Sequence, residues 1–329
     1  MNIQEALKGY TISHCLYVGI KSGIFDIISK YDNKGVTPDI IVNDLKLNRR
    51  YVQIWLNTAY AFGFFNLKDD KYYLLDGYKD FLLDDTNPKY QGEMLKIFID
   101  HLSHDMRNQP EFMKNDKKYS FSEHDMEFVE LVSKRGYLRS QSMIYNYIEN
   151  NGELLNIFKK NSIVCDVGGG TGSFLSGLKE KYPEPKYICI DSDEKSINIG
   201  LSLNNEIEYI YGDIVNTNIK KNIHCIIMVL TLHEIKSNSR INVLKKCYEQ
   251  LVPGGKILIM EFPYPEKASE FNDSRYIMGI LDQYYEMIWD TKQIGWSVQK
   301  ELLELSGFKN IRKNFLSDGI YVLIEAEKI

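Results

Sequence analysis

The stretch that decides the fold is Ile163-Val-Cys-Asp166-Val-Gly168-Gly169-Gly170-Thr171-Gly172-Ser173. It opens on a short apolar run, which is typical of a buried strand, and continues into a cluster of glycines before a helical pattern begins. Glycine has no side chain beyond its Cα, so a backbone rich in glycine can approach a ligand closely. The stretch therefore predicts a strand, a ligand-binding turn and a helix.

Strands and helices alternate in the pattern from this stretch to the C-terminus. We expect strands over 163–167, 187–191, 207–211, 223–229 and 256–261, followed by a closing pair over 310–315 and 319–326. Helical stretches separate most of them, which favours a mostly parallel sheet covered on both faces and ended by an antiparallel strand. The helix before the fifth strand is expected to stop at the glycines of Leu251–Ile257. This half of the chain is predicted to be an α/β domain.

The N-terminal third has a different pattern. A helix is expected over His14–Ser29, Thr37 and Asn48 are expected to cap two more, and two strand-like runs flank the turn Lys68-Asp69-Asp70. Helices followed by a hairpin indicate a winged helix. We predict a winged-helix dimerisation domain over 1–95, a helical connector lining the substrate pocket over 96–158, and a catalytic domain over 159–329.

Composition excludes several classes of protein. The chain has 329 residues, 40 Lys+Arg against 45 Asp+Glu, and a formal net charge of −5. Residues 1–90 hold 11 basic and 11 acidic residues, which disfavours a DNA-binding regulator because duplex binding depends on an excess of positive charge. We expect no nucleic-acid partner, no membrane span, no signal peptide and a cytoplasmic location. Scattered histidines and unpaired cysteines predict neither a metal site nor disulfides.

Acidic residues follow two of the expected strands near the glycine turn. Ser173 stands where a dinucleotide-binding GxGxxG motif would need its last glycine, so a dehydrogenase is disfavoured. Asp191 ends the next strand 23 residues after Gly168, where a carboxylate can accept hydrogen bonds from ribose hydroxyls. Asp213 follows the third strand, near the expected place of an adenine amino group. The spacing predicts a nucleoside-containing ligand.

These residues, together with Leu232-His233-Glu234 and the segment Leu251–Glu261, resemble the S-adenosylmethionine-dependent small-molecule O-methyltransferases of the plant caffeate and bacterial secondary-metabolite type. The resemblance covers nearly the whole chain, since Tyr17–Asp26, Val52–Trp55 and Phe62–Phe64 are similar to that family's dimerisation domain. It implies a Rossmann-like class I methyltransferase domain and a homodimer formed through the N-terminal domain.

The resemblance also implies a site. Residues expected to bind the cofactor S-adenosylmethionine, with S-adenosylhomocysteine as its product, are Asp166, Gly168, Gly170, Asp191, Asp213 and Ile214. His233 is expected to act as the general base, and Glu261, 28 residues later, to orient its imidazole. Glu234 matches an acidic position of the family but equally suits the first turn of a helix, so it stays outside the expected catalytic set.

The predicted function is transfer of a methyl group, by direct displacement, to a hydroxyl of a small aromatic molecule, typically a phenol. A phenol has a pKa of about 10 and an imidazole about 6.5, so proton removal should accompany methyl transfer. N- or C-methylation by the same fold stays open. So does use of the cofactor without methylation, since Gly295 stands where the family has a second supporting carboxylate.

An aromatic and methionine lining would suit a flat apolar acceptor. Asp282 and Glu286, one helical turn apart, are expected to face either this pocket or solvent. The candidates for the lining are Met126, Phe128, Tyr137, Met143, Tyr276, Met278, Tyr284, Tyr285, Met287 and Trp289.

Overall fold

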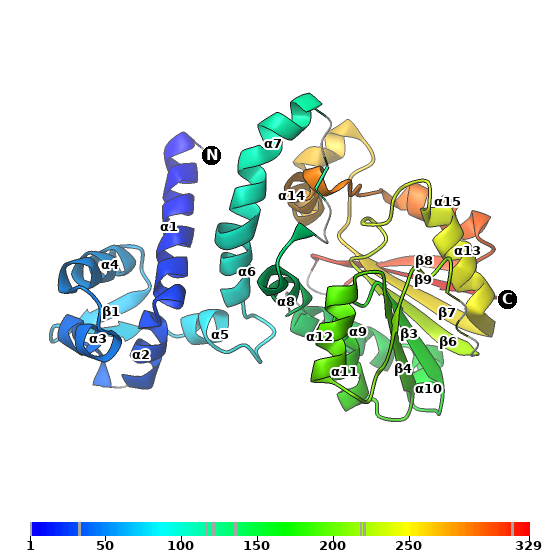
Figure 1. Cartoon of the computed structure of the whole chain (residues 1–329), viewed down its shortest axis with the longest axis horizontal. Helices are drawn as coiled ribbons and strands as arrows, with labels where there is room; N and C mark the ends of the chain where they lie inside the picture. The colour runs from blue at the N-terminus through cyan, green and yellow to red at the C-terminus, as the bar shows by residue number, and fades with distance from the viewer. Residues whose placement is uncertain are drawn as a thin grey trace. The chain divides into compact units, whose positions relative to one another are not determined.

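The computed structural model divides into two compact units, residues 1–104 and 105–329 (Figure 1). It describes residues 2–31, 34–115, 118–119, 123–134, 137–217, 219, 222–316 and 319–329, without the side chains of residues 134, 137 and 138. In the part of the chain so described, no helix combines the length and apolar character needed to cross a membrane.

The first unit is mostly helical. Its elements are α1 (Ile3–Lys21), α2 (Ile24–Tyr31), α3 (Pro38–Leu45), α4 (Arg49–Ala61), β1 (Phe65–Lys68), β2 (Lys71–Leu74), α5 (Tyr78–Leu82), α6 (Gly92–Lys96) and the π-helix η2 (Ile97–Leu102). Thr37 and Asn48 occupy the N-cap positions of α3 and α4, as predicted. The expected helix over His14–Ser29 is wrong in one respect, because it breaks before Gly23, whose φ of +74° disfavours other residues.

The hairpin β1–β2 is antiparallel and turns at Asp69 and Asp70, both with positive φ. An isolated bridge joins Val36 to Tyr72, which ties the hairpin to the segment before α3. Helices followed by a hairpin are present as expected; the winged-helix interpretation of this unit stays a prediction.

The second unit begins with helices and continues into a seven-stranded sheet. The helices are α7 (Ser103–Asn115, its first two residues in the first unit), α8 (Met126–Lys134), α9 (Tyr137–Glu149) and α10 (Gly152–Phe158). The strands are β3 (Ile163–Val167), β4 (Lys186–Asp191), β5 (Glu208–Tyr211), β6 (Ile223–Val229), β7 (Leu251–Glu261), β8 (Lys309–Phe315) and β9 (Val322–Glu327). Their order in the sheet is β5-β4-β3-β6-β7-β9-β8, with β9 antiparallel to both neighbours. The predicted fold class is confirmed.

Successive side chains of β3 enter different cores, which explains its nearly unbroken apolar sequence. Val164 packs in a core with α9, α10, α11 (Ser173–Lys181) and α12 (Glu194–Leu203), whereas Cys165 packs in a second core with α13 (Arg240–Gln250) and α15 (Trp296–Leu305). Both faces of the sheet are therefore buried under helices, as parallel sheets require (Figure 1).

The strand order reverses between β3 and β6, which are direct neighbours in the sheet. In such sheets ligands bind outside the carboxyl ends of the strands at this reversal. The glycine turn after β3 and the His233 turn after β6 lie at this edge. The expected glycine stop before the fifth strand is wrong: α13 already ends at Gln250, and the glycines belong to the first part of β7.

Between β7 and β8 the chain forms three short 3₁₀ turns, a longer helix and α15. The turns are η4 (Ala268–Asn272), η5 (Ser274–Tyr276) and η6 (Met287–Trp289), and the helix is α14 (Ile277–Tyr285). Helix α14 returns to the carboxyl edge of the sheet, where its Asp282 lies beside the strand ends.

Candidate active site

A cavity of about 810 Å³ opens at the carboxyl edge of the sheet. Its wall includes the glycine turn, the end of β4, the residues after β5 and β6, and three residues from the α14–η6 segment. All six residues expected to bind the cofactor line this cavity, together with His233: Asp166, Gly168, Gly170, Asp191, Asp213 and Ile214.

The glycine turn has a backbone conformation that few other residues adopt. Gly168, Gly170 and Gly172 have φ values of +74°, +56° and +71°. A Cβ on Gly168 would lie 2.2 Å from Cγ2 of Thr231, whereas a Cβ on Gly170 would meet nothing nearer than Oγ of Ser133 at 3.6 Å. Gly168 is thus required by packing as well as by φ, and Gly170 leaves open space on the cavity side.

Asp191 is held at the end of β4 by two backbone donors. Its Oδ2 accepts from the N–H of Gly170 at 2.8 Å, and its Oδ1 accepts from the N–H of Asp193 at 2.8 Å. Burial raises the pKa of Asp191, and these backbone hydrogen bonds oppose that rise. The carboxylate is therefore oriented at the cavity wall before any ligand arrives.

Asp166 lies in β3 just before the glycine turn and is deeply buried. The residue is 1% exposed, and its Oδ1 has no hydrogen-bond partner among the described residues. Burial, with the nearby Asp191 charge, raises the pKa of Asp166 to about 8. A buried oxygen without a partner is costly, so this side of the cavity suits a ligand that carries a donor or a positive charge.

Asp213 and Ile214 follow β5 and differ in burial. Oδ1 of Asp213 accepts from the N–H of Val215 at 2.9 Å, and Ile214 is 5% exposed. An apolar side chain beside a carboxylate provides a surface for a flat heterocycle and an acceptor for an amino group.

His233 lies in the turn after β6 and forms a buried pair with Glu261 at the end of β7. Nδ1 of His233 is 2.6 Å from Oε2 of Glu261, while Oε1 of Glu261 accepts from the N–H of Leu232 at 2.8 Å. Burial by itself would lower the pKa of His233, but the charges of Glu261 and Glu286 outweigh it and raise this pKa well above its ordinary value. Oε1 of Glu261 thus fixes the turn, and Oε2 fixes the imidazole.

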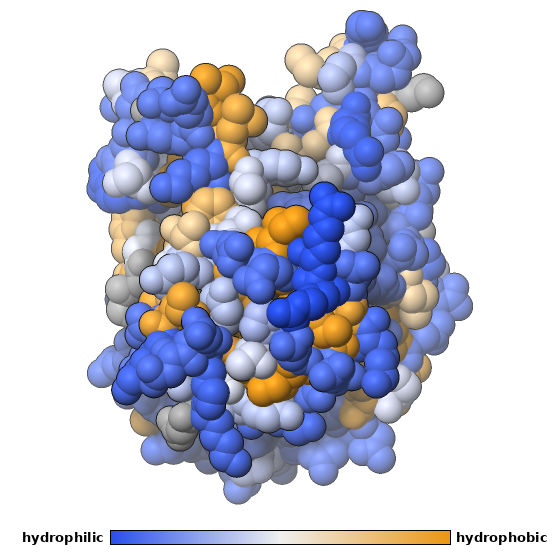
Figure 2. Space-filling model, turned by 90° about the vertical axis from the view of Figure 1, so that its left-hand side faces the viewer, coloured by the Kyte–Doolittle hydropathy of each residue, from blue (hydrophilic) through white to orange (hydrophobic). Residues whose placement is uncertain are grey.

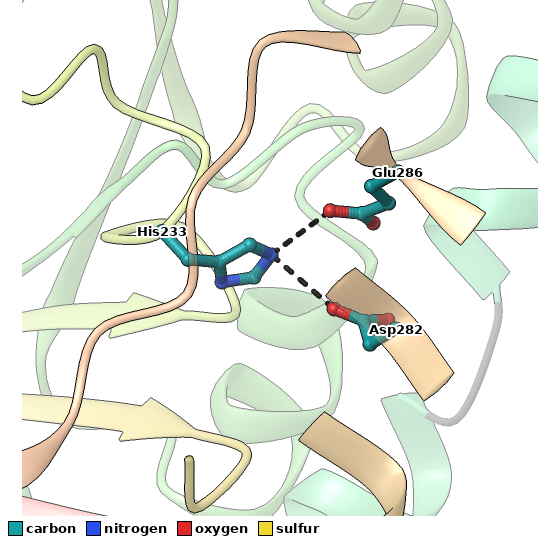
Figure 3. Close-up of side chains that lie close together, drawn as sticks. All are labelled: His233, Asp282 and Glu286. Atoms are coloured by element: carbon teal, nitrogen blue, oxygen red, sulfur yellow. Dashed lines mark ion pairs between the residues drawn. The ribbon is translucent and has the colours of Figure 1, made fainter. Parts of the chain in front are cut away.

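The other imidazole nitrogen faces two more carboxylates. Nε2 of His233 is 3.6 Å from Oδ2 of Asp282 on α14 and 3.4 Å from Oε2 of Glu286 at the end of that helix (Figure 3). Both acids line the cavity. The sequence left open whether they face the pocket or solvent, and the structure shows that they face the pocket. The i, i+4 spacing placed them on one helix face, but nothing local in the sequence related them to His233.

Gly295 carries no carboxylate toward this site. It is the N-cap of α15, and a Cβ there would lie 2.2 Å from Cγ of Glu266, whose Oε1 accepts from the N–H of Ser297. The carboxylates opposite Nε2 come from α14 instead. Glu234 also lines the cavity with an exposed side chain.

The expected aromatic and methionine lining is mostly wrong. Of the candidates whose side chains are described, only Trp289 lines the cavity. Phe128 is fully buried and stacks on His124, whereas Met126, Tyr284 and Met287 are exposed. Tyr137 lies outside the described side chains. The helical pattern of these residues reflects packing and surface positions, which periodicity alone does not distinguish from a pocket wall.

Comparison with known proteins identifies this arrangement. The family model of the O-methyltransferase domain matches residues 105–305, which include every cavity-lining residue except Tyr321. The chain belongs to the O-methyltransferase family. This confirms the resemblance stated from the sequence, and this part of the chain is an S-adenosylmethionine-dependent methyltransferase domain.

Curated relatives match in part of their length. Isoflavone-7-O-methyltransferase 6 of Medicago sativa is 28% identical over 165 residues, 49% of this chain and 45% of that protein. Caffeic acid 3-O-methyltransferase of Zinnia elegans is 32% identical over 114 residues, 35% of this chain and 31% of that protein. The chain thus spans less than half the length of these relatives.

Solved structures match over nearly the full length. Human N-acetylserotonin methyltransferase in complex with S-adenosylmethionine has a TM-score of 0.80 at 15% identity, covering 99% of this chain and 96% of that chain. PigF with S-adenosylhomocysteine has a TM-score of 0.80 at 18% identity, with all of both chains covered. At these identities the likeness establishes the fold.

The cavity residues fit the family's cofactor. The partnerless buried oxygen of Asp166 suits the cationic amino acid part, and Gly170 leaves room for a ligand beside the turn. Asp191 would hold the ribose, while Asp213 and Ile214 would hold the adenine. The bound cofactor supplies a methyl group already activated on a sulfonium.

Proposed function

We propose that the protein is an O-methyltransferase whose acceptor is a hydroxyl, typically phenolic, of a small aromatic molecule. The observation that carries this proposal is the His233–Glu261 pair, which exposes a nitrogen of a buried imidazole to the cofactor cavity. A base at this place can take the hydroxyl proton while the acceptor oxygen is held in line with the methyl group.

Glu261 gives His233 the properties of a base for a phenol. A carboxylate at Nδ1 fixes the tautomer that leaves Nε2 as the acceptor and stabilises the imidazolium that forms. The raised pKa of His233 brings the imidazole nearer to the pKa of a phenol, about 10, so proton transfer costs less than it would to an ordinary histidine. Because the pKa of His233 is raised, the imidazole can act as a base only at a pH high enough to remove its proton.

The chemistry of the cavity wall supports an aromatic acceptor. Trp289 and Val132 provide apolar surface from η6 and α8. The relatives named above act, by their names, on an isoflavone and on caffeic acid, both of them aromatic hydroxyl compounds. For this chain the acceptor class is our proposal.

We further propose the division of labour expected from the sequence: dimerisation by 1–95, acceptor binding with help from the connector 96–158, and cofactor binding by 159–329. A homodimer formed through the N-terminal unit belongs to this proposal. The exposed hydrophobic side chains of α1 support it.

The test is transfer of labelled methyl from S-adenosylmethionine into a panel of phenols, amines and carbon acids by wild type and His233→Ala. We expect a labelled phenolic ether with wild type and a loss of at least about 100-fold with His233→Ala, because general-base catalysis contributes about that much. His14→Ala removes an exposed histidine on α1 and is the matched control.

Binding of S-adenosylhomocysteine, measured by calorimetry, separates a catalytic from a structural role. Retained binding by an inactive His233→Ala supports the base assignment, and joint loss of binding and activity contradicts it. Labelling of amines alone would replace O-methylation by N-methylation. Cofactor binding without any labelled product would favour chemistry that keeps the methyl group.

A further inference from the structure

His233, Asp282 and Glu286 form a buried cluster whose donor atoms converge on one point of the cavity (Figure 3). Their side chains are 3%, 5% and 9% exposed. Nε2 of His233, one oxygen of Asp282 and one oxygen of Glu286 all lie within 4.8 Å of one another. The proposed base accounts for His233 but does not explain why two acids converge on its Nε2.

The distances do not fit direct hydrogen bonds. A charge-assisted bond between an imidazolium and a carboxylate has an N···O distance of about 2.7–2.9 Å. The observed distances from Nε2 are 3.4 Å to Glu286 and 3.6 Å to Asp282. The space between these atoms suits something larger than a proton.

The two distances from Nε2 match donor atoms around a metal ion better than acceptors around an ammonium group. Donor atoms about 2.1 Å from a tetrahedral metal lie about 3.4 Å apart. Acceptors at about 2.8 Å from an ammonium nitrogen would lie about 4.6 Å apart. The observed 3.4 and 3.6 Å agree with the metal.

Oε2 of Glu286 is buried without a hydrogen-bond partner among the described residues. It faces Nε2 of His233 across the gap (Figure 3). A buried carboxylate oxygen without a hydrogen-bond donor is energetically unfavourable unless a cation binds it. Together with the distances, this observation favours a cation in the gap.

The surrounding residues orient the three donors as partners of metal ligands do. Glu261 binds Nδ1 of His233 at 2.6 Å, which directs the lone pair of Nε2 into the gap. Nε2 of Gln293 donates to Oδ2 of Asp282 at 2.9 Å. Arg240, the nearby cation, donates to main-chain oxygens of His233 and Lys292.

We propose that His233, Asp282 and Glu286 bind one divalent transition-metal cation, of the Zn²⁺ or Co²⁺ type, with its remaining coordination positions open to the cavity. One imidazole and two carboxylates are ligands that these ions accept, whereas Mg²⁺ prefers oxygen alone. Metal binding does not depend on the proposed function. Its effect on catalysis does: the metal uses the same Nε2 lone pair as the base, so the bound cation inhibits methyl transfer.

The test is titration of chelator-treated full-length protein with Co²⁺, followed by its visible absorption. We expect one Co²⁺ per chain, bands typical of low coordination number, and displacement by Zn²⁺. Glu286→Gln and Asp282→Asn should each weaken binding by about tenfold or more. Glu304→Gln, which alters an exposed acid of α15, should bind like wild type. Urea unfolding with a midpoint like that of wild type shows that the variants remain folded.

Absence of Co²⁺ bands in wild type, or equal binding by wild type and Glu286→Gln, overturns the site. Inhibition of methyl transfer by one equivalent of Zn²⁺, reversed by a chelator, supports the claim that metal and base use the same Nε2 lone pair. Co²⁺ binding without inhibition of methyl transfer overturns that claim. If the metal-free enzyme transfers no methyl at all, the proposed function fails while the absorption still decides whether the metal binds.

Discussion

The protonation of His233 controls when it can act as a base. The Glu261 and Glu286 carboxylates hold its pKa well above the ordinary value, so the neutral form appears only as the pH rises through that raised pKa. We therefore predict that kcat/KM increases with pH through an inflection above about 6.5. A pH profile of metal-free enzyme measures this.

Glu261→Gln should move that inflection toward acid and lower the maximal rate, because the carboxylate at Nδ1 is lost. The exposed variant Glu304→Gln should leave the profile in place. If the inflection of kcat/KM lies at the same pH in Glu261→Gln as in wild type, the carboxylate does not set the pKa of His233.

Gly168 and Gly254 share a positive φ and differ in their surroundings. Their φ values are +74° and +77°, but a Cβ would lie 2.2 Å from Thr231 at Gly168 and meets nothing within 4 Å at Gly254. Gly254→Ala should cost about 1–2 kcal/mol for the left-handed backbone alone. Gly168→Ala should cost about 1–3 kcal/mol more, because Thr231 must move.

Urea unfolding of the two variants measures this difference. Gly170→Ala tests the cavity side: with the nearest neighbour 3.6 Å away, it should lose cofactor affinity beyond its loss of stability. Equal stabilities of Gly168→Ala and Gly254→Ala would contradict the contact with Thr231.

At the scale of elements, a buried charge pair joins strands β7 and β9. Nζ of Lys256 lies 2.9 Å from Oε1 of Glu325 and 2.8 Å from Oε2 of Glu153, and the Lys256 and Glu325 side chains are 6% and 4% exposed. Oε2 of Glu325 also accepts from the hydroxyl of Tyr147 on α9. The pair thus connects the sheet to the helices that cover it.

Lys256→Met should destabilise the protein by about 3–5 kcal/mol, because it leaves Glu325 charged and buried. Lys300→Met removes an exposed lysine paired with Glu304 at 3.7 Å and should change stability by less than about 1 kcal/mol. Urea unfolding at neutral pH compares the two. Equal effects would mean that Glu325 keeps enough hydrogen bonds without the lysine.

At the scale of the whole molecule, the exposed hydrophobic residues of the N-terminal unit support the proposed homodimer. Ile3, Leu7 and Tyr10 of α1 are 77%, 61% and 66% exposed and follow helical spacing. Orange, hydrophobic side chains interrupt the hydrophilic surface in Figure 2. Such surfaces are typical of protein–protein contacts.

We predict a homodimer in light scattering at micromolar concentration. Leu7→Glu should shift it toward monomer, because it places a charge in the contact, whereas Lys8→Glu on the same exposed helix should not. A monomeric wild type would remove the proposed role of this unit.

The pairing of His233 with the strand-end acid Glu261 was expected from the resemblance to the family, whereas the sequence pattern by itself determined the strand–glycine turn–helix order at 163–173 and the alternation that makes the sheet. These features are predictable because apolar period, glycine conformation and strand ends are local properties of the chain. Only the tertiary structure decided that Asp282 and Glu286 face Nε2 of His233, and that Trp289, unlike Phe128 or Tyr284, lines the cavity. Those contacts join residues about fifty positions or more apart, and depend on where α14 packs, which no local pattern encodes.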